Sequence, residues 1–309
     1  MNSDAFILKR LEWPDHPVDV VLDTDTFNEV DDQFALAYLV ASQDKLRIRG
    51  IFAAPFFNDK ATSPADGMEK SYREIANVLT LCGRSDLLPL VFRGSETYLP
   101  DEKTPVESPA ARELVRLAME RPDDDPLYVI AIGAISNVAS ALLIEPRIAE
   151  KIVVVWLGGN GHHWPHTYEF NMMQDVAGAR VLMQSGAPLV QLPCMGVVTH
   201  LHTTGPELAH WLRGKNALCD YLCDIVFHDE EEVRGRVLWN RVIWDVSAVA
   251  WVLNEGFTAV RTVHAAIPTY DHHYDFRDDT PLIKYVYMVH RDPIFADLFA
   301  KLASFGDPQ

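Results

Sequence analysis

The sequence predicts an α/β protein with an open, doubly wound, mostly parallel sheet flanked by helices. Two observations carry this prediction. Short apolar runs rich in β-branched residues recur along the first two thirds of the chain, and helical patterns stand between them. Such uninterrupted apolar runs are typical of strands that are buried on both faces of a parallel sheet. The regular change from strand to helix favours βαβ units over separate all-β and all-α domains.

The elements can be assigned in chain order. Strands are expected at 18–23, 48–54, 127–132, 152–159 and 188–192, and helical patterns between them begin at Asp31, Gly67, Ser108, Ser136 and Asp175. The last third is less regular, with helices expected near 204–227 and 245–254 and strands near 258–267 and 283–290. No linker, repeat or change of composition divides the chain, so residues 1–309 are predicted to form a single domain.

Charge and composition restrict the partners. The 27 basic and 44 acidic residues give a formal net charge of −17, which repels phosphate backbones, so no nucleic-acid polymer is expected as a partner. No stretch approaches the roughly 20 apolar residues of a membrane span, and the N-terminus lacks a signal-peptide pattern, which predicts a cytoplasmic protein. No cysteines form a CxxC pair, and we expect buried free thiols at Cys82, Cys194, Cys219 and Cys223.

An aspartate cluster stands in the segment LDTDTFNEVDDQFALAYL. Asp23 and Asp25 end a predicted strand, and Asp31 and Asp32 begin a helix. Helix capping explains one of these acids, and the helix dipole favours a second. Four carboxylates packed together would repel one another and take up protons unless a divalent cation neutralised them. The sequence therefore predicts a metal site at the carboxyl end of the first strand, where doubly wound sheets bind ligands.

The same segment resembles the N-terminal signature of the nucleoside hydrolases, enzymes that bind calcium and cleave the N-glycosidic bond of ribonucleosides. The family loop between the second and third aspartates has three residues, and this chain has five, residues 26–30. Asn28 and Glu29 therefore either extend the substrate site or widen the turn.

Three further segments stand in family order. Residues 131–139 resemble a segment whose threonine carbonyl binds calcium, a place taken here by Ser136. Residues 168–182 resemble the family's Glu-Phe-Asn segment, and 242–253 resemble a helix that begins with a metal-binding aspartate. The resemblance implies that Ca²⁺ is held by Asp25, Asp32, Asp245 and the carbonyl of Ser136.

The resemblance also implies the remaining roles. Asp25 would act as the general base as well as a ligand. Asp23 would orient the site without binding the ion itself. His163 replaces a sugar-binding asparagine of the family, and Asn58 stands roughly where another is found. The ribonucleoside would be bound by Asp31, Asn58, His163, Glu169, Asn171 and Trp244. Family members are usually assembled as a homodimer or homotetramer, which we expect here too.

Trp244 stands where many members have a histidine that protonates the departing base. Indole is no useful acid, but it stacks on bases, which favours purine substrates. The alternative is that Trp244 is a core residue at the start of an apolar helix. A second base-stacking ring would come from Phe57, Tyr98, Trp164 or Trp239. Nearby histidines either replace the acid, bind a second metal or are ordinary loop residues: His162, His163, His166, His200 and His202.

Two other functions compete with a ribohydrolase. A non-catalytic nucleoside-binding protein of the same fold is suggested by the missing histidine and the longer loop, but it would have no need of Asp25 as a base. VVLDTDT also fits the nucleophile motif of haloacid-dehalogenase-type phosphatases. That alternative leaves the pair Asp31 and Asp32 unexplained, and the chain shows no convincing counterpart of the later lysine and acidic pair of those enzymes.

Overall fold

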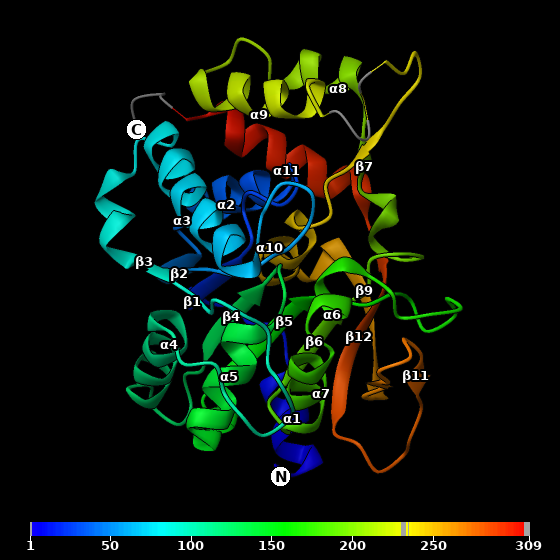
Figure 1. Cartoon of the computed structure of the whole chain (residues 1–309). Coiled ribbons are helices and arrows are strands. Elements are labelled where there is room, and N and C mark those ends of the chain that lie inside the picture. The colour runs from blue at the N-terminus through cyan, green and yellow to red at the C-terminus, as the bar shows by residue number, and fades with distance from the viewer. Residues whose placement is uncertain (1, 230–232, 234, 306–309) are drawn as a thin grey trace.

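Strand β1 (Val18–Thr24) lies inside an eight-stranded sheet, and all of its residues are buried. Its side chains alternate between two apolar cores, with Val20 and Leu22 on one face and Val21 on the other. A strand without a polar face needs a layer of helices on each side. The computed structural model, which describes residues 2–229, 233 and 235–305, has both layers (Figure 1).

The order of the strands determines where a ligand would bind. From one edge to the other the sheet contains β3 (Val91–Arg93), β2 (Leu46–Ala53), β1, β4 (Leu127–Ala131), β5 (Ile152–Leu157), β6 (Leu189–Leu192), β12 (Leu282–Val289) and β9 (Thr258–His264). All neighbours are parallel except β12 and β9, which are antiparallel. The chain goes from β1 outward to β2 and β3 and then returns to β4. The switch point therefore lies between β1 and β4, which is the usual ligand position in such sheets.

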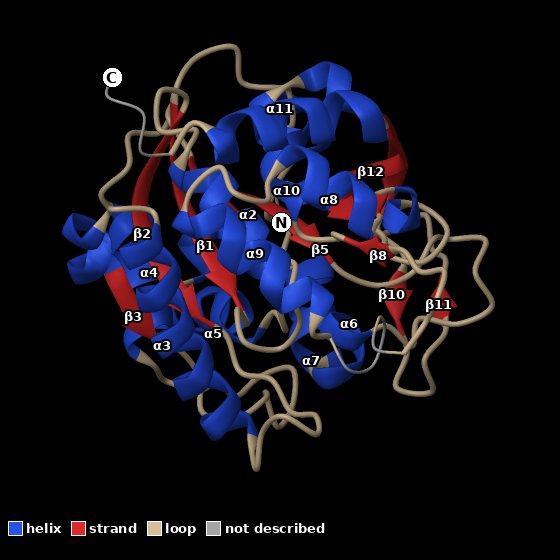
Figure 2. Ribbon diagram, turned by 90° about the horizontal axis from the view of Figure 1, so that it is seen from above, coloured by secondary structure: helices blue, strands red, loops and turns tan. Residues whose placement is uncertain are grey.

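Helices cover both faces of the sheet (Figures 1 and 2). One core contains residues of α1 (Asp4–Arg10), α2 (Asp32–Val40), α3 (Pro64–Leu81), α8 (Gly205–Trp211), α9 (Ala217–Phe227), α10 (Val246–Leu253) and α11 (Arg291–Ala303). The other contains residues of α4 (Pro109–Met119), α5 (Ser136–Ile144), α6 (Phe170–Gln174) and α7 (Val176–Gln184). This arrangement confirms the predicted fold class.

Short elements complete the chain. Two antiparallel ribbons pair β7 (His202–Thr203) with β8 (Arg241–Val242) and β10 (Ile267–Pro268) with β11 (Tyr274–Asp275). The 3₁₀ turns are η1 (Ser85–Leu90), η2 (Pro146–Glu150), η3 (Val198–His200) and η4 (Glu255–Phe257). No helix in the described part of the chain has both the length and the apolar character of a membrane span.

The expected central strands are all present, with ends shifted by one or two residues. Strand β3 was missed because three residues are too few for a recognisable apolar run. Helices α1 and α11 also lie outside the predicted elements. The helix expected near 204–227 is divided into α8 and α9, and Gly214 between them has a φ of 78°, which glycine adopts without strain. The four cysteines are buried and free, as predicted.

Candidate active site

Two helices begin with aspartates that face each other. Asp31 directly precedes α2, and Asp245 directly precedes α10. An aspartate in this position normally accepts a hydrogen bond from a first-turn N–H group. Neither side chain makes a capping bond. Instead, the main-chain N–H of Asp245 donates to Oδ2 of Asp31 at 3.3 Å. Helix capping therefore does not account for these two carboxylates.

Asp31, Asp32 and Asp245 form a buried oxygen cluster. Each presents a carboxylate oxygen, and these atoms all lie within 4.8 Å of one another. The Thr24 hydroxyl donates to Oδ1 of Asp32 at 2.5 Å, which orients that carboxylate. Among the described residues, this is the only group of three or more histidines, cysteines or acids that could hold a metal ion. The loop histidines therefore do not assemble a second such group.

Asp25 lies beside this cluster. Its Oδ2 is buried and has no hydrogen-bond partner among the described residues. Burial, followed by repulsion from Asp32 and Asp31, raises the pKa of Asp25 well above its ordinary value. Burial and neighbouring carboxylates raise the pKa of Asp31 and Asp245 in the same way. Such unsatisfied oxygen ligands fit a hard divalent cation, whose charge would compensate their repulsion.

Asp32 and Asp23 have a smaller shift. Burial raises the pKa of Asp32 to about 7, although the bond from Thr24 opposes the change. Burial likewise raises the pKa of Asp23 to about 7, against the hydrogen bond from Asn137. Nδ2 of Asn137 donates to Oδ1 of Asp23 at 2.7 Å, and its Oδ1 accepts the main-chain N–H of Ser95 at 2.7 Å. The Asn137 amide thus fixes the Asp23 carboxylate, as expected for a residue that orients the site.

A pocket of about 200 Å³ opens over the cluster at the carboxyl ends of the strands. The structure brings five of the predicted site residues to its wall: Asp31, Glu169, Asn171, Trp244 and Asp245. It also adds residues that the sequence did not identify as ligands or contacts: Ile132, Leu157, Phe170, Cys194 and Met195. Glu29, for which an extension of the substrate site was one of two alternatives, lines the pocket as well. Ile132 directly follows β4, beside the switch point, so its position after a strand was the available signal.

Glu169 and Asn171 are fixed by the main chain around them. The Glu169 carboxylate caps α6 and accepts the N–H groups of Gly159 at 2.7 Å, Asn171 at 2.8 Å and Met172 at 3.1 Å. Nδ2 of Asn171 donates to the carbonyls of Ile132 and Leu157 at 3.2 and 3.0 Å. Burial raises the pKa of Glu169 in spite of its N–H donors. These contacts hold both side chains rigidly at the pocket wall.

Ser136 and His163 are not brought to this wall. Ser136 is the first residue of α5, where a carbonyl is directed along the helix toward its own hydrogen bond, and its hydroxyl donates to Asp175 at 2.5 Å. His163 is exposed on a turn in which the N–H of Trp164 donates to the carbonyl of Gly161 at 2.8 Å. The calcium ligand expected at Ser136 and the sugar contact expected at His163 therefore stay predictions.

Asn58 is directed toward the longer loop. Its Nδ2 donates to Oδ1 of Asn28 at 2.7 Å, and it is absent from the described wall of the pocket. Its main-chain carbonyl also accepts the N–H of Ala61. Asn58 therefore connects two loops in this structure, and a direct contact with ribose stays a prediction.

The position of Trp244 fits both of the roles considered for it. The residue is half-buried, lines the pocket and packs against the apolar core. Of the other aromatic candidates, Trp239 packs edge-on against Phe227, 5.9 Å between ring centroids. The Tyr98 hydroxyl and the main-chain N–H of Phe57 both donate to Oε1 of Gln174. Burial raises the pKa of Tyr98, and the negative charge of the nearby Asp25 adds to this shift.

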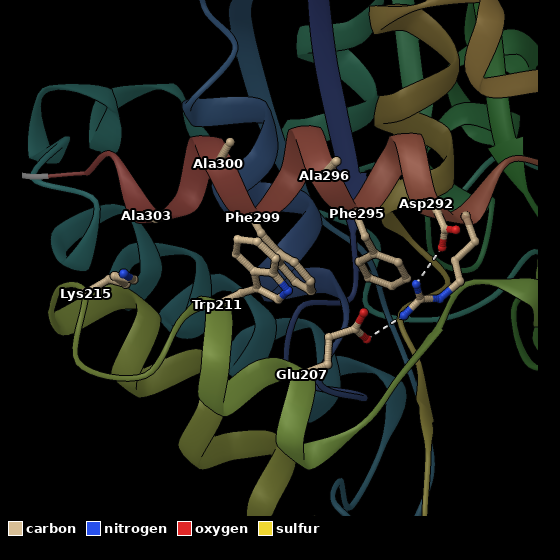
Figure 3. A pocket seen from close by; sticks show the side chains of 10 residues that line it. Glu207, Trp211, Lys215, Asp292, Phe295, Ala296, Phe299, Ala300 and Ala303 are labelled. Atoms are coloured by element: carbon tan, nitrogen blue, oxygen red, sulfur yellow. Dashed lines mark hydrogen bonds and ion pairs between the residues drawn. The ribbon is translucent and has the colours of Figure 1, made fainter.

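A second cavity, of about 440 Å³, lies between α8 and α11, and is distinct from the acidic cluster. Trp211 of α8 and Phe295 and Phe299 of α11 point into it (Figure 3). An ion pair between Arg291 and Glu207, 2.5 Å, lies at one end. This cavity shares no lining residue with the pocket over the aspartates, so the predicted chemistry belongs to the latter.

Comparison with known proteins identifies relatives of this chain. The pyrimidine-specific ribonucleoside hydrolase RihA of Enterobacter sp. is 29% identical over 194 residues, which cover 55% of this chain and 58% of the relative. The non-specific ribonucleoside hydrolase RihC of Salmonella paratyphi B is 24% identical over 176 residues, 56% of this chain and 55% of the relative. The chain thus matches little more than half the length of these relatives.

Solved structures agree with the fold. A purine-preferring ribonucleoside hydrolase from Gardnerella vaginalis has a TM-score of 0.73 at 18% identity, covering 93% of this chain and 98% of that one. The family model described as inosine-uridine preferring nucleoside hydrolase matches residues 20–281, which include all the aspartates of the site. The chain therefore belongs to the inosine-uridine preferring nucleoside hydrolase family.

Proposed function

We propose that this protein catalyses the calcium-dependent hydrolysis of the N-glycosidic bond of ribonucleosides, giving ribose and the free base. The observation that carries the proposal is one convergence of side chains. The buried carboxylates of Asp31, Asp32 and Asp245 lie within 4.8 Å of one another, beside a pocket that Glu169 and Asn171 also line. Membership of the family supports the same reaction.

Asp25, Asp32 and Asp245 are the proposed side-chain ligands of Ca²⁺. For the main-chain ligand we favour the carbonyl of Ile132, a residue that lines the pocket, over that of Ser136. When bound, the ion would supply positive charge that favours deprotonation of a water molecule. Asp25 would take that proton, a role supported by its buried, unpartnered Oδ2. Asp23, held by Asn137, would orient this end of β1.

Asp31, Glu169 and Asn171 are the proposed ribose contacts. Their rigid placement would restrain the sugar as the bond to the base breaks through an oxocarbenium-like transition state. Trp244 would form an aromatic wall for the base, which supports a preference for purines. The relatives' names include pyrimidine-specific and purine-preferring hydrolases, so the base must be measured directly.

The test is incubation of the protein with calcium and a panel of ribonucleosides, followed by measurement of reducing sugar. Release of ribose that stops on chelation and returns with calcium is the expected result. Saturable nucleoside binding without ribose release would instead support the non-catalytic alternative. A single domain, a homodimer or homotetramer and a cytoplasmic location stay predictions. Light scattering of the purified protein measures its assembly.

A further inference from the structure

The turn that follows β5 fixes one side of the Glu169 carboxylate. Gly159 in this turn has a φ of 75°, which glycine adopts without strain, and its N–H donates to Oε2 of Glu169 at 2.7 Å. The other two N–H groups that Glu169 accepts belong to α6, which follows Glu169 directly. A shift of the turn would therefore remove the one main-chain contact that holds the carboxylate from outside its own helix.

On one side, this turn is bound to the main chain of the neighbouring strand β6. The N–H of Gly158 donates to the carbonyl of Leu192 at 3.1 Å. The carbonyl of Gly159 accepts the N–H of Cys194 at 2.8 Å. The two main chains thus stay paired just beyond the ends of β5 and β6.

On the other side, the turn is bound by the side chain of Tyr274. This residue begins β11, where it is paired with Pro268 of β10. Its hydroxyl donates to the carbonyl of Asn160 at 2.9 Å, across 114 positions of sequence. The hydroxyl also accepts Nε2 of Gln191 at 3.2 Å, and the same amide donates to the carbonyl of Gly158 at 3.1 Å. One hydroxyl group therefore connects the turn to β6 and to the β10–β11 ribbon.

The Tyr274 hydroxyl fits closely against the turn. A Cβ atom added to Gly159 would lie 2.3 Å from the oxygen of Tyr274, so the two groups are in direct contact. Burial raises the pKa of Tyr274, so the hydroxyl keeps its proton and stays a donor. The ring packs edge-on against His162, with 5.3 Å between the ring centroids. These contacts fix the ring and direct its donor at the carbonyl of Asn160.

We propose that Tyr274 is a positioning residue for substrate binding. Its hydroxyl holds the turn after β5, and the turn holds the Glu169 carboxylate in place for the sugar. Tyr274 is absent from the described wall of the pocket, whereas Glu169 belongs to it, so Tyr274 would act through Glu169. This inference rests on the proposed function, in which Glu169 contacts the ribose. It makes the β10–β11 ribbon a support of the substrate site.

The test uses Tyr274→Phe, which removes the hydroxyl and keeps the ring. For each calcium-loaded protein, kcat and KM are measured with inosine, and the Kd of ribose is measured by calorimetry. KM and Kd should each rise about fivefold, the effect of one hydrogen bond of average strength. The kcat should change by less than about twofold, because a sugar contact present in both ground and transition states acts through KM. Unchanged KM and Kd would overturn the proposal.

The matched control is Tyr221→Phe. The Tyr221 hydroxyl donates to Oε1 of Glu74, which joins α9 to α3, and Tyr221 is absent from the described wall of the pocket. This variant also loses a hydroxyl that is bonded inside the protein, so its Tm should fall while KM and Kd keep their original values. An equal rise of KM in both variants would overturn the proposal, because the effect would then come from a general loss of stability.

A double-mutant cycle determines whether Tyr274 acts through Glu169. In Glu169→Ala the carboxylate is absent, so the position of the turn no longer affects the sugar. In that background Tyr274→Phe should change KM for inosine by less than about twofold, against about fivefold in the original protein. A fivefold rise in both backgrounds would contradict the proposal, since Tyr274 would then act independently of Glu169.

This proposal and the proposed function fail in different ways. If inosine binds and is not hydrolysed, the proposed function is wrong, and the Kd of inosine replaces KM in the same comparisons. If inosine is hydrolysed and Tyr274→Phe changes neither KM nor Kd, only the role of Tyr274 is wrong. If inosine is neither bound nor hydrolysed, both are wrong.

Discussion

The main-chain N–H of Asp245 donates to the carboxylate of Asp31 at 3.3 Å, across 214 positions of sequence. This contact brings the start of α10 to the start of α2 and closes the carboxylate cluster. Because desolvation and repulsion oppose the charged forms of these aspartates, the cluster depends on protons or on a cation for its stability.

Replacing the proposed base should abolish turnover and retain the fold. Asp25→Asn keeps the shape of the side chain but cannot take a proton, so kcat should fall by about 10²–10⁴-fold or more, the usual contribution of general acid–base catalysis. Release of reducing sugar from inosine measures the effect, and circular dichroism checks the fold. Asp44→Asn, at an exposed position, serves as the control and should retain full activity. Near-normal turnover in Asp25→Asn would remove Asp25 from its role.

Without calcium, the protein should become less stable as the pH rises from about 4 to about 7. The folded state raises the pKa of Asp23 and Asp32 from 3.8 to about 7, so it keeps protons that the unfolded chain releases over this interval. Each such group lowers the free energy of unfolding by up to about 1.4 kcal/mol per pH unit. Above about pH 7 the loss from these two groups is complete.

Thermal melts across this pH range, with and without calcium, test the linkage. Calcium should raise Tm more at pH 8 than at pH 5, because at low pH protons compete with the ion for the carboxylates. Asp23→Asn removes one of the two titrating groups, so the metal-free Tm should fall less steeply with pH than in the original protein. A metal-free Tm that rises steadily between pH 4 and 7 would contradict the direction of these pKa shifts.

Removing the amide that supports Asp23 should destabilise the fold. Asn137→Ala leaves the N–H of Ser95 and the carboxyl of Asp23 without their buried partner, which costs about 1–3 kcal/mol. Urea unfolding at pH 7 measures the free energy. Asn77→Ala, at an exposed position of α3, should change it by less than about 0.5 kcal/mol. Equal stability of the two variants would mean that the network around Asp23 contributes nothing.

Trp244 has contacts with both the pocket and the core, and these give different results on truncation. If the ring stacks on the base, Trp244→Ala should lose about 1–3 kcal/mol of base-dependent binding, more for purine than for pyrimidine ribosides. If packing dominates, it should instead lose about 3–5 kcal/mol of stability.

The ratio of kcat/KM for inosine to that for uridine, measured beside a thermal melt, separates the two effects of Trp244. Trp244→Phe serves as the conservative variant, since it keeps an aromatic face but leaves a small cavity. We expect the ratio to fall in Trp244→Ala and to be largely retained in Trp244→Phe. An unchanged ratio with a strongly lowered Tm would end the proposed purine preference.

The local sequence determined much of the fold and the identity of the acidic site. Apolar runs such as 18–23 and 152–159 identified the central strands, because a strand buried on both faces needs apolar side chains at most of its positions. Asp23, Asp25, Asp31 and Asp32 could be grouped because they surround a single strand-to-helix turn. Short or exposed elements, such as β3, carry too weak a pattern to be recognised.

Tertiary structure alone decided which distant groups face the pocket. Ile132 rather than Ser136 reaches its wall because α5 begins at Ser136 and directs that carbonyl along the helix. The turn around Gly161 leaves His163 exposed. The pairing of Glu29 with Arg241 depends on how β8 packs against the loop after β1, a contact between segments 212 positions apart. Local periodicity contains no information about such contacts, since they arise only when the layers of the fold close around the sheet.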